Sequence, residues 1–131
     1  MTPQQEALRD KLKKGSDIYK EAESLRAYIK ENEKIQAGAC DPIIQLQLQQ
    51  QNDELKIKYA QLIDVRSKID RCIGTIEDID LKSILIMRYL GHVNTLQIAE
   101  RMHYGRNTIN RKHKDALNIL MKTGADKLLD Y

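Results

Sequence analysis

The segment from Thr95 to Lys114 constrains the fold more than any other part of the chain. It predicts a helix, a tight turn and a second helix that is rich in basic residues. Ala99 is small enough for two helices to cross closely, and Gly105 can adopt the positive φ angle that such a turn requires. Apolar residues fall where the two helices would share a core, at Ile98, Met102, Tyr104 and Ile109. The pattern is that of a helix-turn-helix unit.

The second helix of this unit separates an apolar stripe, which includes Ile109, from a polar and cationic one. Residues 101–114 include five Lys or Arg and no Asp or Glu, which is the charge pattern expected of a surface that binds a polyanion. The alternative is a solvated basic helix face. The residues on the candidate DNA-binding faces are Arg106, Asn107, Thr108, Asn110, Arg111 and Lys114.

Composition favours helix along the whole chain. The 131 residues include no Phe or Trp and only two Pro, and the net charge is +3. We therefore expect an all-α protein with one modest core. No apolar stretch is long enough for a leader or a membrane span, so we expect a soluble, cytoplasmic protein with no membrane partner.

The sequence shows no pattern for catalysis or for a cofactor. Cys40 and Cys72 are too far apart to suggest a disulfide framework, and with His103 and His113 they lack the close pairing of zinc ligands. A glycine-rich phosphate loop and a nucleophile with a base are also missing. We predict a protein that is not an enzyme and holds no metal or cofactor. RNA binding is a further alternative, although the aromatic platforms usual for single strands are missing.

Residues 1–76 are predicted to form an antiparallel helical hairpin that resembles a coiled coil. Gly38 marks the end of one helix, and Pro42 occupies the first position of the next. Ser16 or Asp17 is the expected N-cap of the first long helix. The expected helix ranges are 1–14, 16–36 and 42–75.

A seven-residue repeat runs along the second long helix. At about 34 residues this helix would outrun its partner of about 21 residues by roughly 20 Å. The uncovered half would need either the C-terminal domain or a second subunit as its partner, and Asn52 and Arg66 in the repeat suit both alternatives. The candidate oligomerisation residues, for a homodimer through this helix, are Leu48, Leu55, Leu62, Ile69, Ile73 and Ile76.

Local signals predict the helix ends of the C-terminal domain. Acidic residues open a helix after Gly74, Gly91 ends it, Asn94 or Thr95 caps the next helix, and Gly124 closes the basic helix. The buried face of the first of these helices is predicted to consist of Ile79, Ile84, Leu85, Met87 and Tyr89.

Three segments of the C-terminal half share their spacing with a known family. They are residues 83–90, 97–102 and 108–117, which together resemble region 4 of sigma-70 factors. With the preceding hairpin, the chain is similar to phage-encoded and prophage-encoded regulators near the ArpU and RinA late-gene activators. The resemblance implies a tri-helical helix-turn-helix domain over 77–131 that binds double-stranded promoter DNA in a bacterial cytoplasm. It also raises RNA polymerase as a partner. Because a counterpart of sigma region 2 is lacking, it implies a regulator rather than a complete sigma factor.

The resemblance also assigns roles to single residues. The positions that correspond to base-reading side chains are Arg106, Asn107, Asn110 and Arg111. Thr95 and Arg101 correspond to phosphate contacts, and Lys112 and Lys114 are expected to contact phosphates as well. Asn107 and Thr108 have a second interpretation as helix N-caps. The family has an apolar residue at the position of Lys112, so either His113 or Ala116 closes the core in its place or that end of the helix is more loosely packed.

A competing hypothesis is a protein-interaction module, a coiled-coil adaptor or antirepressor without intrinsic DNA specificity. The repeat between Leu48 and Ile76 supports it, whereas the absence of acids from 101–114 argues against it. Salt-sensitive binding to duplex DNA would separate the two hypotheses.

Overall fold

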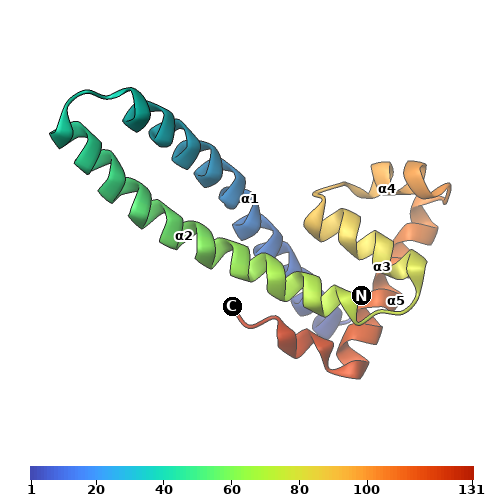
Figure 1. Ribbon diagram of the computed structural model, residues 1–131. Helices are drawn as coiled ribbons and strands as arrows, with labels where there is room; N and C mark the ends of the chain where they lie inside the picture. Colours follow the sequence, from blue (N-terminus) through green and yellow to red (C-terminus); the bar gives the residue numbers. More distant parts are fainter. The chain divides into compact units, whose positions relative to one another are not determined.

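The computed structural model describes residues 1–131 and confirms the prediction of an all-α protein. The long helices α1 (Pro3–Gly38) and α2 (Pro42–Gly74) precede α3 (Ile79–Leu85), α4 (Thr95–Met102) and α5 (Arg106–Thr123) (Figure 1). A π-helical turn, Ile86–Leu90, extends α3, and a 3-10 turn, Ala125–Leu128, follows α5. None of the helices combines the length and the apolar composition that a membrane span requires.

The chain divides into two compact units. Met1–Asp17 and Val65–Tyr131 form one of them, here called the core unit. Ile18–Asp64 form the other, here called the hairpin unit. Each long helix therefore contributes to both units. The sequence-based division after residue 76 follows the order of the elements, whereas the packing assigns the first turns of α1 and the last turns of α2 to the same unit as α3, α4 and α5.

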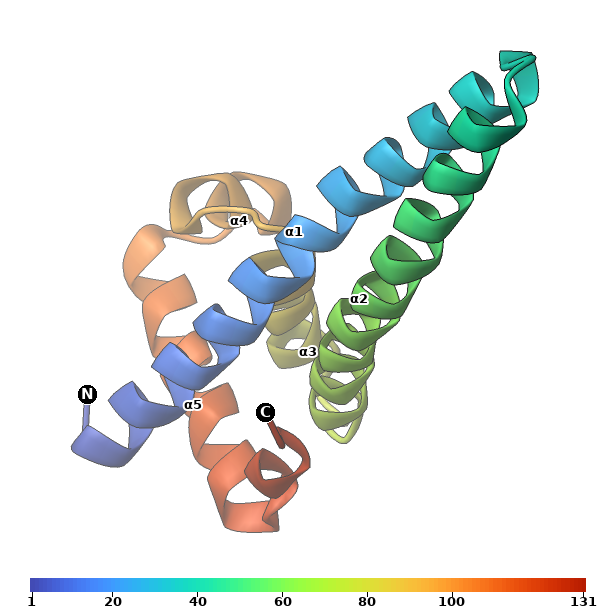
Figure 2. The ribbon, with the colours of Figure 1, turned by 90° about the vertical axis from the view of Figure 1, so that its left-hand side faces the viewer.

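The hairpin unit pairs the parts of α1 and α2 on either side of their connecting loop in antiparallel fashion, as predicted (Figure 2). Pro42 is the first residue of α2, and the Asp41 carboxylate accepts a hydrogen bond of 2.9 Å from the backbone N–H of Ile43. The seam between the helices is polar at Asn32 and Asn52, whose side chains hydrogen-bond at 3.0 Å. A buried amide pair of this kind favours one register of two helices over others.

The first helix is continuous, so the predicted break before Ser16 is wrong. α1 begins at Pro3, where Thr2 and Gln5 cap each other: the Gln5 N–H donates to Thr2 Oγ1 and the Thr2 N–H donates to Gln5 Oε1. Gly15 lies inside the helix, at a position where the packing leaves no room for a side chain. A Cβ atom would lie 2.7 Å from the Ile69 side chain.

The predicted overhang of the second helix is also wrong. α1 has 36 residues and α2 has 33, so the two helices are nearly equal in length. Ile69, Ile73 and Ile76 are buried within the core unit of a single chain. Leu48, Leu55 and Leu62 are half-buried. The apolar repeat therefore does not require a second subunit to cover it.

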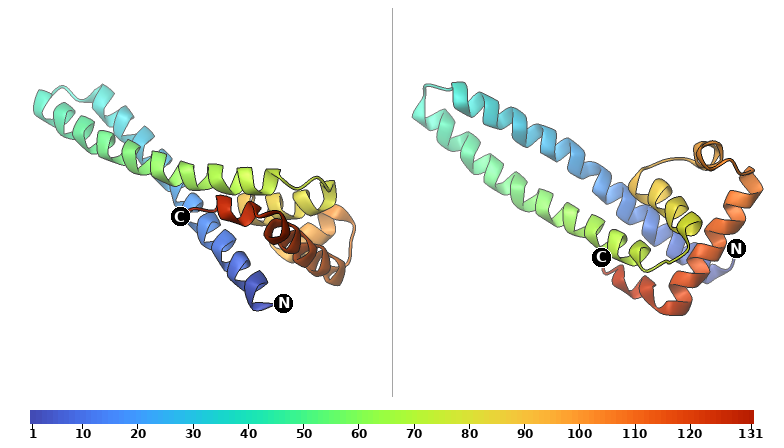
Figure 3. Two further views of the ribbon diagram at one scale, coloured as in Figure 1. Left: turned by 90° about the horizontal axis from the view of Figure 1, so that it is seen from below. Right: turned by 45° about the vertical axis from the view of Figure 1, so that its right-hand side comes forward.

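The core unit combines segments that are far apart in the sequence. Asp78 caps α3 by accepting a hydrogen bond of 3.0 Å from the backbone N–H of Leu81. Ile79 was predicted to be buried but is 80% exposed, because it is the first residue of α3 and points away from the face formed by Leu81, Ile84 and Leu85. The C-terminal tail lies beside α2 (Figure 3).

Candidate nucleic-acid interface

α4 and α5 are joined by three residues and share a small apolar cluster. Asn94 caps α4 as predicted, since its side chain accepts a hydrogen bond of 2.9 Å from the backbone N–H of Gln97. Met87, Val93 and Met102 pack around the cluster. The members of the cluster are Ile84, Ile98, Ala99 and Ile109. These contacts fix the beginning of α5 against α3 and α4, and Ala99 lies where the two helices meet, as predicted.

The turn between α4 and α5 uses a different residue from the one expected. His103 adopts the left-handed conformation, with φ of 59°, whereas Gly105 is extended, with φ of −72°. His103 ends α4, and the backbone N–H of Tyr104 donates to the carbonyl of Ala99 at 3.1 Å. Histidine is among the residues that tolerate the left-handed region comparatively well. Gly105 then leads directly into α5 as its N-cap.

The side of α5 opposite its buried stripe is open to solvent. Asn107, Arg111 and Lys114 follow each other at intervals of four and three residues, so they lie on one side of the helix. All three are exposed, as is Asn110 on the flank of this side. Arg106 is also exposed, although it is in line with the buried stripe, because it is the first residue of α5. The residues of the buried stripe are Ile109, His113, Ala116, Leu117 and Leu120. A surface of guanidinium, amide and ammonium groups is thus held on a helix that is anchored from behind.

Three of the predicted contact residues are less available. Thr95 is half-buried, and its hydroxyl accepts a hydrogen bond of 3.0 Å from Nη1 of Arg88. Thr108 is also half-buried. Lys112 Nζ lies 3.7 Å from a carboxylate oxygen of Asp80, an ion-pair partner that the expectation of a phosphate-binding Lys112 did not include. Arg101, near the end of α4, is exposed.

His113 belongs to the core beneath α5. It is 3% exposed, and its Nε2 lies 2.7 Å from the hydroxyl of Tyr89. Burial lowers the pKa of His113 to about 4, and the positive charges of Arg88 and Arg9 act in the same direction. The ring is therefore neutral near pH 7. Ala116 is fully buried as well, so both residues close the core beneath α5.

Sequence reasoning missed the roles of Arg88, Asp80 and Tyr104. Tyr104 was placed in the core but is 37% exposed, and its hydroxyl donates a hydrogen bond of 2.6 Å to Asp80. This bond, with the negative charge of the carboxylate, raises the pKa of Tyr104. Two sequence features could have indicated this contact: a tyrosine directly before the turn glycine, and an acid in the first turn of α3.

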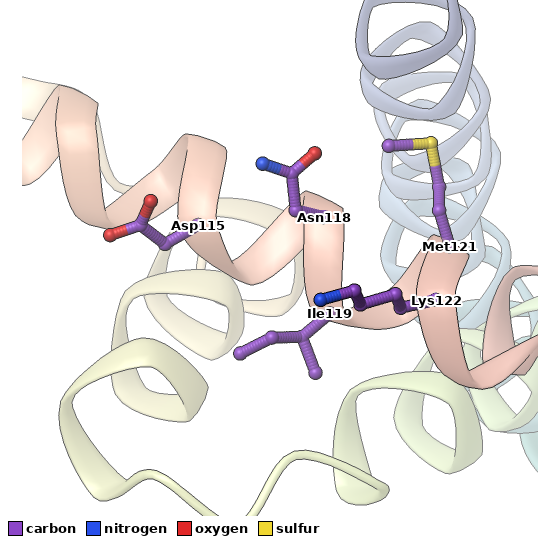
Figure 4. A pocket seen from close by; sticks show the side chains of 5 residues that line it. All are labelled: Asp115, Asn118, Ile119, Met121 and Lys122. Carbon is purple, nitrogen blue, oxygen red and sulfur yellow. The ribbon is translucent and has the colours of Figure 1, made fainter.

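Surface hollows adjoin the C-terminal half of α5, beyond the basic residues. One has a volume of about 580 Å³ and is lined by Asp115, Asn118, Ile119, Met121 and Lys122 (Figure 4). Another, of about 440 Å³, lies between Met121 and the first turns of α1. In Figure 4, Met121 points toward α1, and Asp115 and Asn118 project from the α5 ribbon. The candidate interface is thus separate from the hollowed part of the helix.

The family match extends over α2, α3, α4 and nearly all of α5. The family is described as a protein of unknown function (DUF1492), and it matches residues 29–121, which is more than half of the chain. The chain therefore belongs to this family. No curated protein matches the chain. No solved structure matches it either.

Proposed function

We propose that this DUF1492 protein is a sequence-specific DNA-binding regulator of transcription that reads promoter DNA with the exposed side of α5. The observation that carries the proposal is the division of this helix into two sides. Ile109 and Leu117 are fully buried, whereas Asn107 and Arg111 are exposed on the opposite side. An acid-free stretch from 101 to 114 surrounds these exposed residues.

The dimensions of α5 suit the major groove of DNA. Its 18 residues correspond to a length of about 27 Å. The major groove of B-DNA, about 12 Å wide, admits an α-helix. The short turn leaves the first residues of α5 exposed, and residues near the N-terminus of a recognition helix are the ones that reach base edges in helix-turn-helix proteins.

The exposed side chains have complementary chemistry. Arginine can form two parallel hydrogen bonds with guanine, and asparagine can pair with adenine in the same way. We assign base contacts to Arg106, Asn107, Asn110 and Arg111. Lys114 and Arg101 would contact phosphates, which adds affinity and salt dependence but no sequence information. Lys112 is left out of this set because Asp80 binds it.

The resemblance to sigma region 4 supports a promoter as the target. It supports the assignment of α4 and α5 as the two helices of a helix-turn-helix, and it makes bacterial RNA polymerase a candidate second partner. The proposed regulator is phage-encoded or prophage-encoded and works in the host cytoplasm. A helical pair in front of the proposed DNA-binding helices is compatible with the late-gene activators named above.

Selection of bound duplexes from a random pool, at two salt concentrations, tests the proposal. On the selected site, Arg106→Ala or Arg111→Ala should each cost about 1 to 3 kcal/mol of binding free energy and relax the preference at one base pair. Lys114→Ala should weaken all sequences alike and reduce the slope of log K against log salt by about 0.9. The matched control is Lys122→Ala, an exposed lysine in the last turn of the same helix.

The results can also refute the proposal. Failure to enrich any sequence, together with binding that does not respond to salt, would exclude DNA recognition by α5. Identical sequence profiles for Arg106→Ala and Lys114→Ala would contradict the separate roles of base reader and phosphate contact. Unchanged helix content, measured by circular dichroism, must accompany every variant so that unfolding is not mistaken for a lost contact.

A protein-interaction role is the second candidate function, and exposed apolar residues of α2 favour it. Ile43, Leu46 and Ile57 are 67%, 60% and 64% exposed. Surface apolar groups of this kind are common at protein–protein contacts. An adaptor or antirepressor, or a homodimer, would use them without requiring α5 to bind DNA. Sedimentation of the unmodified chain, with Leu46→Lys as the matched variant, measures the homodimer directly.

A further inference from the structure

Asp80 joins three parts of the core unit at one carboxylate oxygen. The Tyr104 hydroxyl donates to Asp80 Oδ2 at 2.6 Å, and Lys112 Nζ lies 3.7 Å from the same oxygen. The Lys112 ammonium also lies 5.1 Å from the centre of the Tyr104 ring. Asp80 is in the first turn of α3, Tyr104 lies in the turn before α5, and Lys112 lies within α5. Each member of this cluster contacts the other two.

The cluster changes the number of cations that α5 presents to a polyanion. Lys112 directly follows Arg111, which is exposed, but the Lys112 side chain is only 25% exposed. The Asp80 carboxylate pairs with its charge, and the tyrosine ring adds a cation–π contact. A lysine in this position on a DNA-binding helix would otherwise be free to swing to a neighbouring phosphate, because its four-carbon side chain is flexible.

We propose that Asp80 is a positioning residue that holds Lys112 away from DNA and thereby limits the sequence-independent affinity of the protein. The inference rests on the proposed DNA binding by α5. Every cation that neutralises a phosphate strengthens binding to any duplex, whereas the base-reading residues distinguish one duplex from another. Binding to competing genomic sites reduces the protein available for its target. With Lys112 held by Asp80, binding to competing genomic sites is weaker.

The salt dependence of binding to a random duplex tests the inference. Asp80→Asn keeps an oxygen that can accept the Tyr104 hydrogen bond but removes the charge that holds Lys112. It should raise affinity for random duplex by about 3-fold to 10-fold and increase the magnitude of the salt slope by about 0.9, the value of one added phosphate contact. In the double variant Asp80→Asn with Lys112→Met, both changes should disappear.

Two further variants separate the proposed role from simpler ones. Asp115→Asn removes an exposed acid from α5 itself, so it controls for the general effect of one less negative charge. Tyr104→Phe removes the hydrogen bond but leaves the ion pair and the ring, so it should not alter the slope. A slope change in Asp115→Asn equal to that in Asp80→Asn, or one that persists without Lys112, would overturn the inference.

Lys112→Met alone keeps the inference testable if Asp80→Asn fails to fold. Because Lys112 is already restrained, its removal should leave the salt slope of the otherwise unmodified protein unchanged. A decrease of about 0.9 would show that Lys112 contacts a phosphate and would overturn the inference while leaving DNA binding intact. Absence of any duplex binding by the unmodified protein would instead refute the proposed function, and the role of Asp80 with it.

Discussion

The hairpin unit and the core unit pair their helices with different kinds of side chain. In the hairpin unit, Ala22 and Ile29 are the buried apolar residues. Closer to the loop, the contact between α1 and α2 is a hydrogen-bonded pair of buried amides, Asn32 and Asn52. In the core unit, apolar side chains from α1, α2, α3, α4 and α5 are buried together, and Leu12 is among those that are fully enclosed. One unit is held chiefly by local pairing, and the other by contacts between distant segments.

This difference indicates where stability and proposed function are coupled. A fully buried Leu or Ile side chain contributes roughly 1.5 to 3 kcal/mol relative to an exposed one, so the core unit has the larger apolar contribution. The same buried residues fix α5, whose other side is the proposed DNA-binding surface. In the hairpin unit, hydrogen bonds between amides add little net free energy but penalise alternative registers. Damage to the core unit should therefore abolish DNA binding, whereas damage to the hairpin seam should alter pairing.

Truncation of a core leucine should have the largest effect. Leu117→Ala removes a fully buried side chain of α5 and should lower the free energy of unfolding by about 2 to 5 kcal/mol. Leu55→Ala is the matched variant in the hairpin unit, where the side chain is half-buried and the loss should be smaller. Urea unfolding followed by circular dichroism measures both. Equal losses would remove the proposed distinction between the two units.

The helix ends were the most predictable part of the fold because their signals are local. Pro42 begins α2, Asn94 caps α4 and Gly124 ends α5 with φ of 78°. Each of these effects needs only the residue and its neighbours within four positions. The N-terminal cap by Thr2 and Gln5 has an equally local signal, because Gln5 follows Thr2 by three residues, as in a capping box.

The remaining features depend on partners that are distant in the sequence. From its neighbours alone, Gly15 indicates a helix break. The structure shows instead that Tyr131 and Ile69 pack against it inside α1. Helical periodicity predicts a phosphate contact for Lys112, but it cannot predict the ion pair with Asp80, which is 32 positions earlier in the sequence. The exposed residues Asn107, Arg111 and Lys114 could be predicted because helical periodicity alone separates them from Ile109. Their binding to DNA stays a prediction.

A buried histidine should give the core unit a pH dependence that the hairpin unit lacks. The pKa of His113 is lowered to about 4, below the 6.5 of an exposed histidine, so the unfolded chain binds the proton more readily. Stability from this group should be complete above pH 6.5 and should decrease as the pH falls toward 4, by up to about 3 kcal/mol. Unfolding measured at several pH values, with His113→Gln as the control, tests this. If the stability of His113→Gln decreased between pH 6.5 and 4 as steeply as that of the unmodified protein, the pH dependence would come from other groups.

The amide seam of the hairpin unit can be tested by removing one partner or both. Asn52→Ala removes the acceptor of the 3.0 Å hydrogen bond from Asn32 Nδ2, which keeps its bond of 3.1 Å to Gln51 Oε1, and should cost about 0.5 to 1.5 kcal/mol. Replacement of both residues with leucine should restore or increase stability while relaxing the helix register or allowing association of chains. Thermal melts and sedimentation report the two effects. A double variant that is less stable than Asn52→Ala would show that the amides contribute more than register.

The smallest expected effect concerns the exposed ion pair between Lys56 and Glu33 of the hairpin unit. Nζ of Lys56 lies 3.5 Å from the Glu33 carboxylate, and both side chains are about half exposed, at 53% and 52%. Solvent and salt screen such a pair, so Glu33→Gln should change the free energy of unfolding by about 0 to 1 kcal/mol. The change should shrink further in 1 M salt, where the screening length falls to about 3 Å. A loss above 2 kcal/mol that persists at high salt would mean that the hairpin unit depends on charge pairing, and its contrast with the core unit would then rest on electrostatics instead of on the amide seam.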